Sequence, residues 1–214
     1  MILSDKDIRS YIEKGINLIE PFEESSLQSE SFDLSIGNTF SKYNADFKIV
    51  DLENQVSIDN AYTSYPIPPS GYILGPKEYI LVSIAEKITL PKNISAHVRP
   101  RTKFTRIGLI VSNQHCNSSY SGNLNLGLLN VNPFAIVIHS GMKIAQIVFE
   151  ELKSVPTKHK QYNGSYQNED GTEGALFNTE ISTSRLSLPH RNNRFKNDVL
   201  AQSAFTKLME GLEK

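Results

Sequence analysis

A short run of cationic and hydroxyl side chains near the middle of the sequence has the composition of a phosphate-binding site. It comprises Arg101, Thr102, Lys103 and Arg106. Arginine presents a planar fork that matches phosphate oxygens, lysine presents a point charge, and threonine presents a hydroxyl donor. The sequence therefore predicts an anion-binding site here. A solvated basic loop is the alternative interpretation.

The charges around this basic cluster are segregated along the chain. From Lys87 to Phe149 there is no Asp or Glu, and the seven basic residues give this window a charge of +7. The remainder carries 15 basic and 23 acidic residues, a balance of −8. A cationic window suits a phosphorylated ligand. It also lacks, apart from histidine, the side chains best suited to activating water at neutral pH. The pattern favours anion binding and argues against ordinary carboxylate catalysis.

Composition bounds the class of protein. A chain of 214 residues suits one domain with appendages. The single cysteine, Cys116, excludes an internal disulfide and fits a reducing compartment. The N-terminus carries charges where a signal peptide needs an apolar core, and no apolar run is long enough to span a membrane. We therefore expect a cytoplasmic protein without a membrane partner. The net charge of −1 gives no case for nucleic-acid binding.

The secondary-structure elements around the basic cluster are predicted to be mainly strands. Ser4 can cap a helix, with Asp7 completing a weak capping box and Gly15 ending it. Beyond this helix, apolar runs recur about every ten residues between turn residues, which predicts a β-barrel or sandwich of jelly-roll type over residues 1–153.

One of these predicted strands shows a regular alternation of apolar and other residues. In the segment GNLNLGLLN, residues 122–130, alternate leucines form one face. Asn123, Asn125 and Gly127 then share the opposite face.

The C-terminal part changes character. Residues 154–194 are polar and turn-rich, which predicts a lid or linker. In residues 195–214, apolar residues recur four apart, as at Leu200, Ala204 and Leu208, which predicts a helix. This helix packs on its own barrel or contacts a partner or another subunit.

Six segments, in order, carry a resemblance to a known family. They read MILSDKDIRSYIEKG with IEPF, LQSESFDLSIGN, GYILGPKEYILVSIAEKITLPKNISAHV, RTKFTRIGL, HSGMKIAQIVFEEL and GSYQ. They are similar to segments of the trimeric dCTP deaminases, which share a fold with the trimeric dUTPases. The resemblance covers residues 1 to about 167.

This resemblance implies a homotrimer of distorted, dUTPase-like β-barrels with nucleotide sites at the subunit interfaces. It implies a pyrimidine deoxynucleoside triphosphate as ligand, with Mg²⁺ on its phosphates. Two chemistries are possible in such proteins: deamination at C4 of cytosine, and hydrolysis between the α- and β-phosphates.

Several ligand-binding positions carry over from the resemblance. Arg101 and Arg106 match the two arginines of the motif "RSSLxR". Thr102 matches a serine that hydrogen-bonds the ligand or orders the catalytic water, and Lys103 replaces the second serine. Gln146 matches a glutamine near the family's last long strand, although an ordinary strand residue is equally open.

The C-terminal segment GSYQ supplies two further candidate ligand residues. Tyr166 and Gln167 match residues that could close over the triphosphate as a lid, the alternative being a disordered tail.

The catalytic carboxylates do not carry over. The deaminase glutamate of "GxITLELxN" falls on Gly127, and the dUTPase aspartate of "xIDxxYxGE" falls on Asn117. Neither residue can accept a proton at neutral pH. His115 is a weak substitute base, more often structural or a ligand hydrogen-bonder in such a position. No residue is therefore assigned a catalytic role.

Other candidates for chemistry have ordinary explanations. Cys116 is expected to be a buried small hydrophobe, and Asp33 to be structural. The acidic residues Glu169, Asp170 and Glu173 lie on the tail and could enter a neighbouring site.

Metal chemistry is not expected from the protein itself. The zinc-deaminase signature, H-x-E with P-C-x-x-C, is absent, so we expect no zinc and no protein-bound metal.

The sequence favours a nucleotide-binding relative of the dCTP deaminases that has lost the family reactions. The alternative is an active deaminase or dUTP pyrophosphatase whose base comes from elsewhere.

Overall fold

A computed structural model describes residues 1–46, 48–172 and 174–177. The chain divides into two compact units. The larger unit contains residues 1–43 and 62–174, and the smaller contains residues 44–61 and 175–214.

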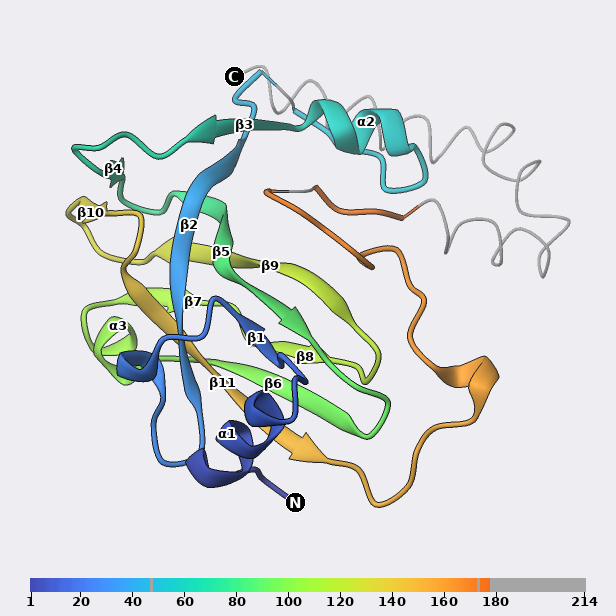
Figure 1. The fold of residues 1–214 in the computed structure, drawn as a ribbon. Helices are drawn as coiled ribbons and strands as arrows, with labels where there is room; N and C mark the ends of the chain where they lie inside the picture. Colours follow the sequence, from blue (N-terminus) through green and yellow to red (C-terminus); the bar gives the residue numbers. More distant parts are fainter. Residues whose placement is uncertain (47, 173, 178–214) are drawn as a thin grey trace, which may run out of the picture. The chain divides into compact units, whose positions relative to one another are not determined.

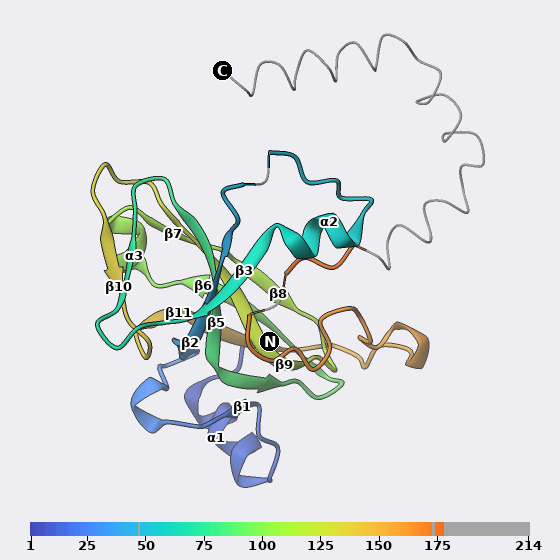
Figure 2. The same ribbon diagram turned by 90° about the horizontal axis from the view of Figure 1, so that it is seen from above.

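The larger unit is mainly β, which confirms the predicted fold class. In the described part of the chain, one antiparallel sheet has nine strands, and its path runs β7-β9-β5-β2-β11-β6-β8, with β1 paired to β5 and β3 to β2. Strands β4 and β10 form a separate pair. The large sheet curls on itself (Figures 1 and 2). The strands are β1 Ile19–Glu20, β2 Phe32–Tyr43, β3 Tyr62–Pro66, β4 Tyr72–Leu74, β5 Tyr79–Thr89, β6 Ile94–Pro100, β7 Leu109–Val111, β8 Gln114–Cys116, β9 Ser121–Asn130, β10 Ile136–Ile138 and β11 Lys143–Glu151.

The N-terminal helix forms as its end signals predict. Helix α1, Asp5–Glu13, begins after Ser4, whose hydroxyl accepts from the backbone N–H of Asp7. The Asp7 carboxylate in turn accepts from the Ser4 N–H at 2.9 Å. Gly15 follows the helix with a φ of 76°, a left-handed conformation that glycine adopts without strain. The predicted capping box and glycine stop are both confirmed.

Strand β9 shows the predicted alternation, but both of its faces are covered. Leu124, Leu126 and Leu128 are buried in the core, at 4%, 0% and 0% exposure. Asn125 and Gly127, on the opposite face, are buried as well. This second burial comes from the C-terminal segment and from a neighbouring tyrosine, and it decides what chemistry the strand can perform.

The smaller unit contains a helix that the sequence analysis did not predict. Helix α2, Gln55–Asn60, begins at Asn54, whose side chain accepts from the Ser57 N–H. The predicted C-terminal helix over residues 195–214 lies outside the described residues. Within the described ranges, no helix is long and apolar enough to cross a membrane.

Candidate functional site

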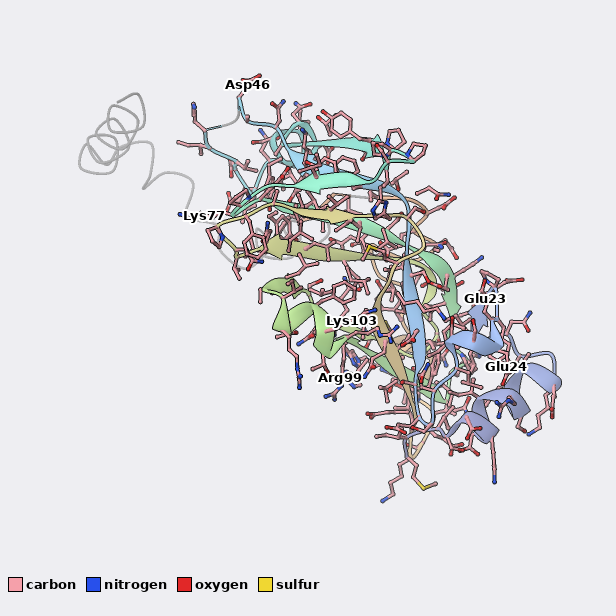
Figure 3. The ribbon with its side chains drawn as sticks, turned by 90° about the vertical axis from the view of Figure 1, so that its left-hand side faces the viewer. Glu23, Glu24, Asp46, Lys77, Arg99 and Lys103 are labelled. Atoms are coloured by element: carbon pink, nitrogen blue, oxygen red, sulfur yellow. The ribbon has the colours of Figure 1, made fainter. Side chains whose placement is uncertain are left out.

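The basic cluster lies on a short helix held by one buried aromatic ring. Strand β6 ends at Pro100, and helix α3, Thr102–Arg106, follows directly. Phe104 is 7% exposed and anchors the helix to the core, whereas Thr102, Lys103 and Arg106 are exposed. Lys103 Nζ lies 5.1 Å from the centre of the Phe104 ring. The side-chain view shows Lys103 on the same flank of the molecule as Arg99 of β6 (Figure 3). The helix thus displays two cations and a hydroxyl to solvent.

The first arginine of the cluster is held by a buried carboxylate. Arg101 Nη1 lies 2.8 Å from Asp33 Oδ2, and the Asp33 side chain is only 4% exposed. Gln28 Nε2 also donates to Asp33, at 3.3 Å. Gln146 on β11 is paired in register with Asp33 on one side and Arg99 on the other. Asp33 therefore has a more definite role than the general structural one expected, because it fixes the guanidinium of Arg101.

The tail lies against its own barrel. Gln167 donates to the carbonyl of Ser119 at 3.0 Å and accepts from the Ser121 N–H at 3.2 Å. The Asn168 N–H donates to the carbonyl of Ser121 at 2.7 Å. Tyr166 lies close enough to Tyr62 of β3 to add a small part to the rise in the pKa of Tyr62, which burial chiefly causes. These contacts place Gln167 at the beginning of β9.

The two groups of predicted ligand residues are not brought together within one chain. Helix α3 contacts β7, which pairs with β9 from Leu128 to Asn130. Gln167 contacts the other end of β9, at Ser121. This separation corresponds to roughly 25 Å of strand. A single chain therefore holds the basic cluster and the lid residues apart.

Tyr79 fills the space beside Gly127. A Cβ atom added at Gly127 would lie 2.4 Å from Tyr79 Oη and 2.9 Å from its Cζ. The Tyr79 ring is held in place by stacking on Tyr43, with ring centres 5.5 Å apart. Burial raises the pKa of the Tyr79 hydroxyl, so it stays protonated at neutral pH. A phenol that cannot act as a base thus occupies the room that a longer side chain at Gly127 would need.

The tail brings one carboxylate to the same face of β9. Glu169 is 8% exposed and accepts from the Tyr120 hydroxyl at 2.7 Å and from Asn125 Nδ2 at 3.1 Å. Asn125 stands two residues before Gly127 and on the same face. Among the described residues, Asn125 Oδ1 is a buried acceptor with no hydrogen-bond partner. The sequence analysis noted Glu169 only as part of an acidic patch. Glu169 is distinguished from the rest of that patch by the conformation of the tail, which no local motif encodes.

The neighbouring member of that acidic patch does not share its burial. Asp170 is exposed, and Glu173 lies outside the described residues.

The residues before β9 have simpler roles. Cys116 is 3% exposed, which confirms the expected buried thiol. Burial, with a smaller contribution from the Glu169 charge, raises its pKa to about 12. Asn117 is exposed, and its carbonyl accepts from the Tyr120 N–H at 3.1 Å. His115 is exposed on β8 and faces His97 of β6. Among the described residues, the His115 ring has one hydrogen-bond contact, 3.5 Å from its Nδ1 to that of His97, and no carboxylate orients it as a general base.

Comparisons with known proteins agree on one family. A family model described as dCTP deaminase-like matches residues 2–152. A "dCTP deaminase, dUMP-forming" of Sulfurihydrogenibium sp. is 35% identical over 173 residues, covering 80% of this chain and 94% of the relative. The corresponding protein of Nanoarchaeum equitans is 32% identical over 187 residues, with the same coverage.

A solved structure supports the same fold. The 2'-deoxycytidine 5'-triphosphate deaminase from Agrobacterium tumefaciens matches with a TM-score of 0.55 and 21% identity, covering 69% of this chain and 47% of that one. At this identity the likeness concerns the fold. The family match over residues 2–152 and the relative that is 35% identical show that this chain belongs to the dCTP deaminase-like family.

Proposed function

We propose that this protein binds a nucleoside triphosphate, of the pyrimidine deoxynucleotide class, through Arg101, Thr102, Lys103 and Arg106, and that it has lost the family's catalysis. The main support for this proposal is the exposed cationic helix α3, which lies in a window of the sequence that lacks acidic residues. In the described residues no ion pair involves Lys103 or Arg106, so both charges are available to a ligand. The protein would then sense or sequester the nucleotide in the cytoplasm.

We also propose that the working form is a homotrimer. The basic cluster and the lid residues Tyr166 and Gln167 lie near opposite ends of β9 in one chain. A neighbouring subunit could bring the second group to the first, which would place the complete site between subunits. Light scattering tests this arrangement, and a monomer at micromolar concentration would overturn it.

The proposed loss of catalysis rests on the residue types at Gly127 of β9 and at Asn117, which precedes this strand. Attack of water on C4 of cytosine or on the α-phosphorus requires a group that removes a proton as the water attacks. Gly127 and Asn117 cannot do so. Tyr79 Oη lies 2.4 Å from an added Cβ at Gly127, so a carboxylate side chain could not be accommodated there without displacing the ring.

Mg²⁺ fits this proposal as a companion of the phosphates. Magnesium usually binds through one or two carboxylates together with substrate phosphates. The carboxylate nearest the cluster, that of Asp33, is already paired with Arg101. The cluster residues would therefore hold the phosphate oxygens, and the ion would neutralise part of their charge.

A second candidate function, an active dCTP deaminase, is favoured by one observation. Glu169 places a carboxylate on the face of β9 that contains Gly127, held by Tyr120 and Asn125. If Glu169 acts as the base, Glu169→Gln abolishes turnover of dCTP while Asp170→Asn, an exposed neighbour, leaves it intact. No turnover by the unmodified protein would remove this candidate.

Calorimetry tests the proposed binding. Unmodified protein is titrated with dCTP, dUTP, dTTP and CTP in the presence of Mg²⁺. We expect saturable binding of at least one deoxynucleotide that weakens as the salt concentration rises, because the contacts are charged. The absence of binding by all four compounds up to millimolar concentration would contradict the proposal.

A further inference from the structure

Two histidines from separate strands meet on the surface of the sheet. His97 on β6 and His115 on β8 are directly opposite in the antiparallel register. Their Nδ1 atoms are 3.5 Å apart, and their ring centres are 4.7 Å apart. Eighteen positions separate them in the sequence. Only strand pairing therefore brings the two imidazoles together.

The separation of the two nitrogens matches that of two ligands on one metal ion. Imidazole nitrogens bind zinc at about 2.0–2.1 Å, so two such atoms on a tetrahedral ion stand about 3.4 Å apart. In the metal-free protein, the same separation allows one imidazole N–H to donate to the other nitrogen. A metal would displace that proton, and the donor ring would carry its hydrogen on Nε2 instead.

The pair also borders an accessible space. A cavity of about 380 Å³ is lined by His97, Val98, Arg99, Asn113, Gln114 and His115. His115 is exposed and His97 is partly exposed, so an ion can reach both rings from solvent. The described residues contain no group of three or more His, Cys, Asp or Glu side chains able to hold a metal. Water or an added ligand must therefore fill the other coordination positions.

We propose that His97 and His115 form an open, two-histidine site for a first-row transition-metal ion such as Ni²⁺ or Zn²⁺. Imidazole is a preferred ligand of these ions, whereas Mg²⁺ requires oxygen ligands. The site is separate from the zinc-deaminase motif, which this chain lacks. It is also independent of the nucleotide-binding proposal, because neither histidine belongs to the basic cluster on α3.

Substitution of Arg99 distinguishes a metal-ion site from an anion site in this cavity. It is two residues from His97 on the same face of β6 and lines the same cavity. Its positive charge opposes a bound cation but would favour a bound anion. Arg99→Gln should therefore tighten metal binding, whereas it would weaken the binding of phosphate if the cavity were an anion site.

Calorimetry on the full, untagged chain measures the proposed binding. Chelator-treated protein is titrated with Ni²⁺ and separately with inorganic phosphate. We expect one Ni²⁺ per chain, a loss of at least tenfold in affinity for His97→Gln and for His115→Gln, and tighter binding for Arg99→Gln. His139→Gln, an exposed histidine on another part of the surface, is the matched control and should bind like the unmodified protein. Both substituted histidines reach solvent, and melting curves check that the variants fold.

Two results would overturn the proposal. One is Ni²⁺ binding that is absent in the unmodified protein or unchanged in the His97→Gln/His115→Gln double variant. The other is phosphate binding that Arg99→Gln abolishes, without Ni²⁺ binding, which would identify the cavity as an anion site.

Discussion

Adding a single methyl group at Gly127 tests whether Tyr79 has closed the position of the missing carboxylate. In Gly127→Ala, the new Cβ would lie 2.4 Å from Tyr79 Oη, whereas ordinary contacts begin at 3.4 Å. The tyrosine must therefore move by about 1 Å within a packed group of rings. Overpacking of this kind typically costs about 1–3 kcal/mol, offset by a gain of up to about 1 kcal/mol from replacing glycine in a strand. We expect a net loss of about 1–2 kcal/mol.

The expected loss should depend on the tyrosine. In a Tyr79→Ala background the clash is gone, so Gly127→Ala should be neutral or should stabilise by about 0.5 kcal/mol. The double-mutant cycle then gives a coupling energy of about 1–2.5 kcal/mol, since contacting residues are not additive. Urea denaturation followed by circular dichroism, at one fixed protein concentration, measures each corner of the cycle.

A matched glycine controls for the general effect of adding a methyl group. Gly75 lies in a loop, and an added Cβ there would meet nothing nearer than 3.4 Å. Gly75→Ala should therefore show no coupling to Tyr79→Ala. Additive effects of Gly127→Ala and Tyr79→Ala would show that the Tyr79 ring does not occupy this space.

Three further predictions concern the cluster and the buried thiol. Arg106→Ala should weaken dCTP binding roughly 10- to 100-fold, because a charge-assisted contact contributes about 1.5–3 kcal/mol. Lys92→Ala, outside the cluster, should have little effect in the same calorimetry. Equal losses of affinity in the two variants would show a nonspecific charge effect. Asp33→Asn should lower the free energy of unfolding, measured in urea, by about 1–3 kcal/mol. This loss is smaller than for a fully buried ion pair because the Arg101 side chain is 28% exposed. An unchanged unfolding midpoint would contradict the pairing of Asp33 with Arg101. Cys116, with a pKa raised to about 12, should react with an aromatic disulfide reagent at pH 8 only after unfolding. Its contribution to stability should decline as pH rises from about 9 towards 12. Rapid reaction of the folded protein would contradict the burial of Cys116.

Much of the fold could be predicted because its signals are local. The capping box at Ser4, the glycine stop at Gly15 and the alternating leucines of β9 each act through neighbouring residues, and each is confirmed. Helix α2 was missed because six residues carry only one turn and a half of pattern.

The site was less predictable because its key contacts join distant parts of the chain. Asp33 of β2 meets Arg101, which follows β6, across the intervening strand β11, and Tyr79 of β5 meets Gly127 of the neighbouring strand β9. Glu169 reaches β9 only because the tail folds back over it. The spacing of residues in the sequence does not predict such contacts, because strand register and the docking of the tail create them.

One experiment tests both parts of the proposal that this protein binds a nucleotide and leaves it unchanged. Unmodified protein is incubated with dCTP or dUTP and Mg²⁺, bound nucleotide is measured by equilibrium dialysis, and products are resolved by chromatography over hours. We predict bound, intact triphosphate. Turnover near 1 s⁻¹ or above, within the ordinary enzyme range, would contradict the claim and point to a base such as Glu169.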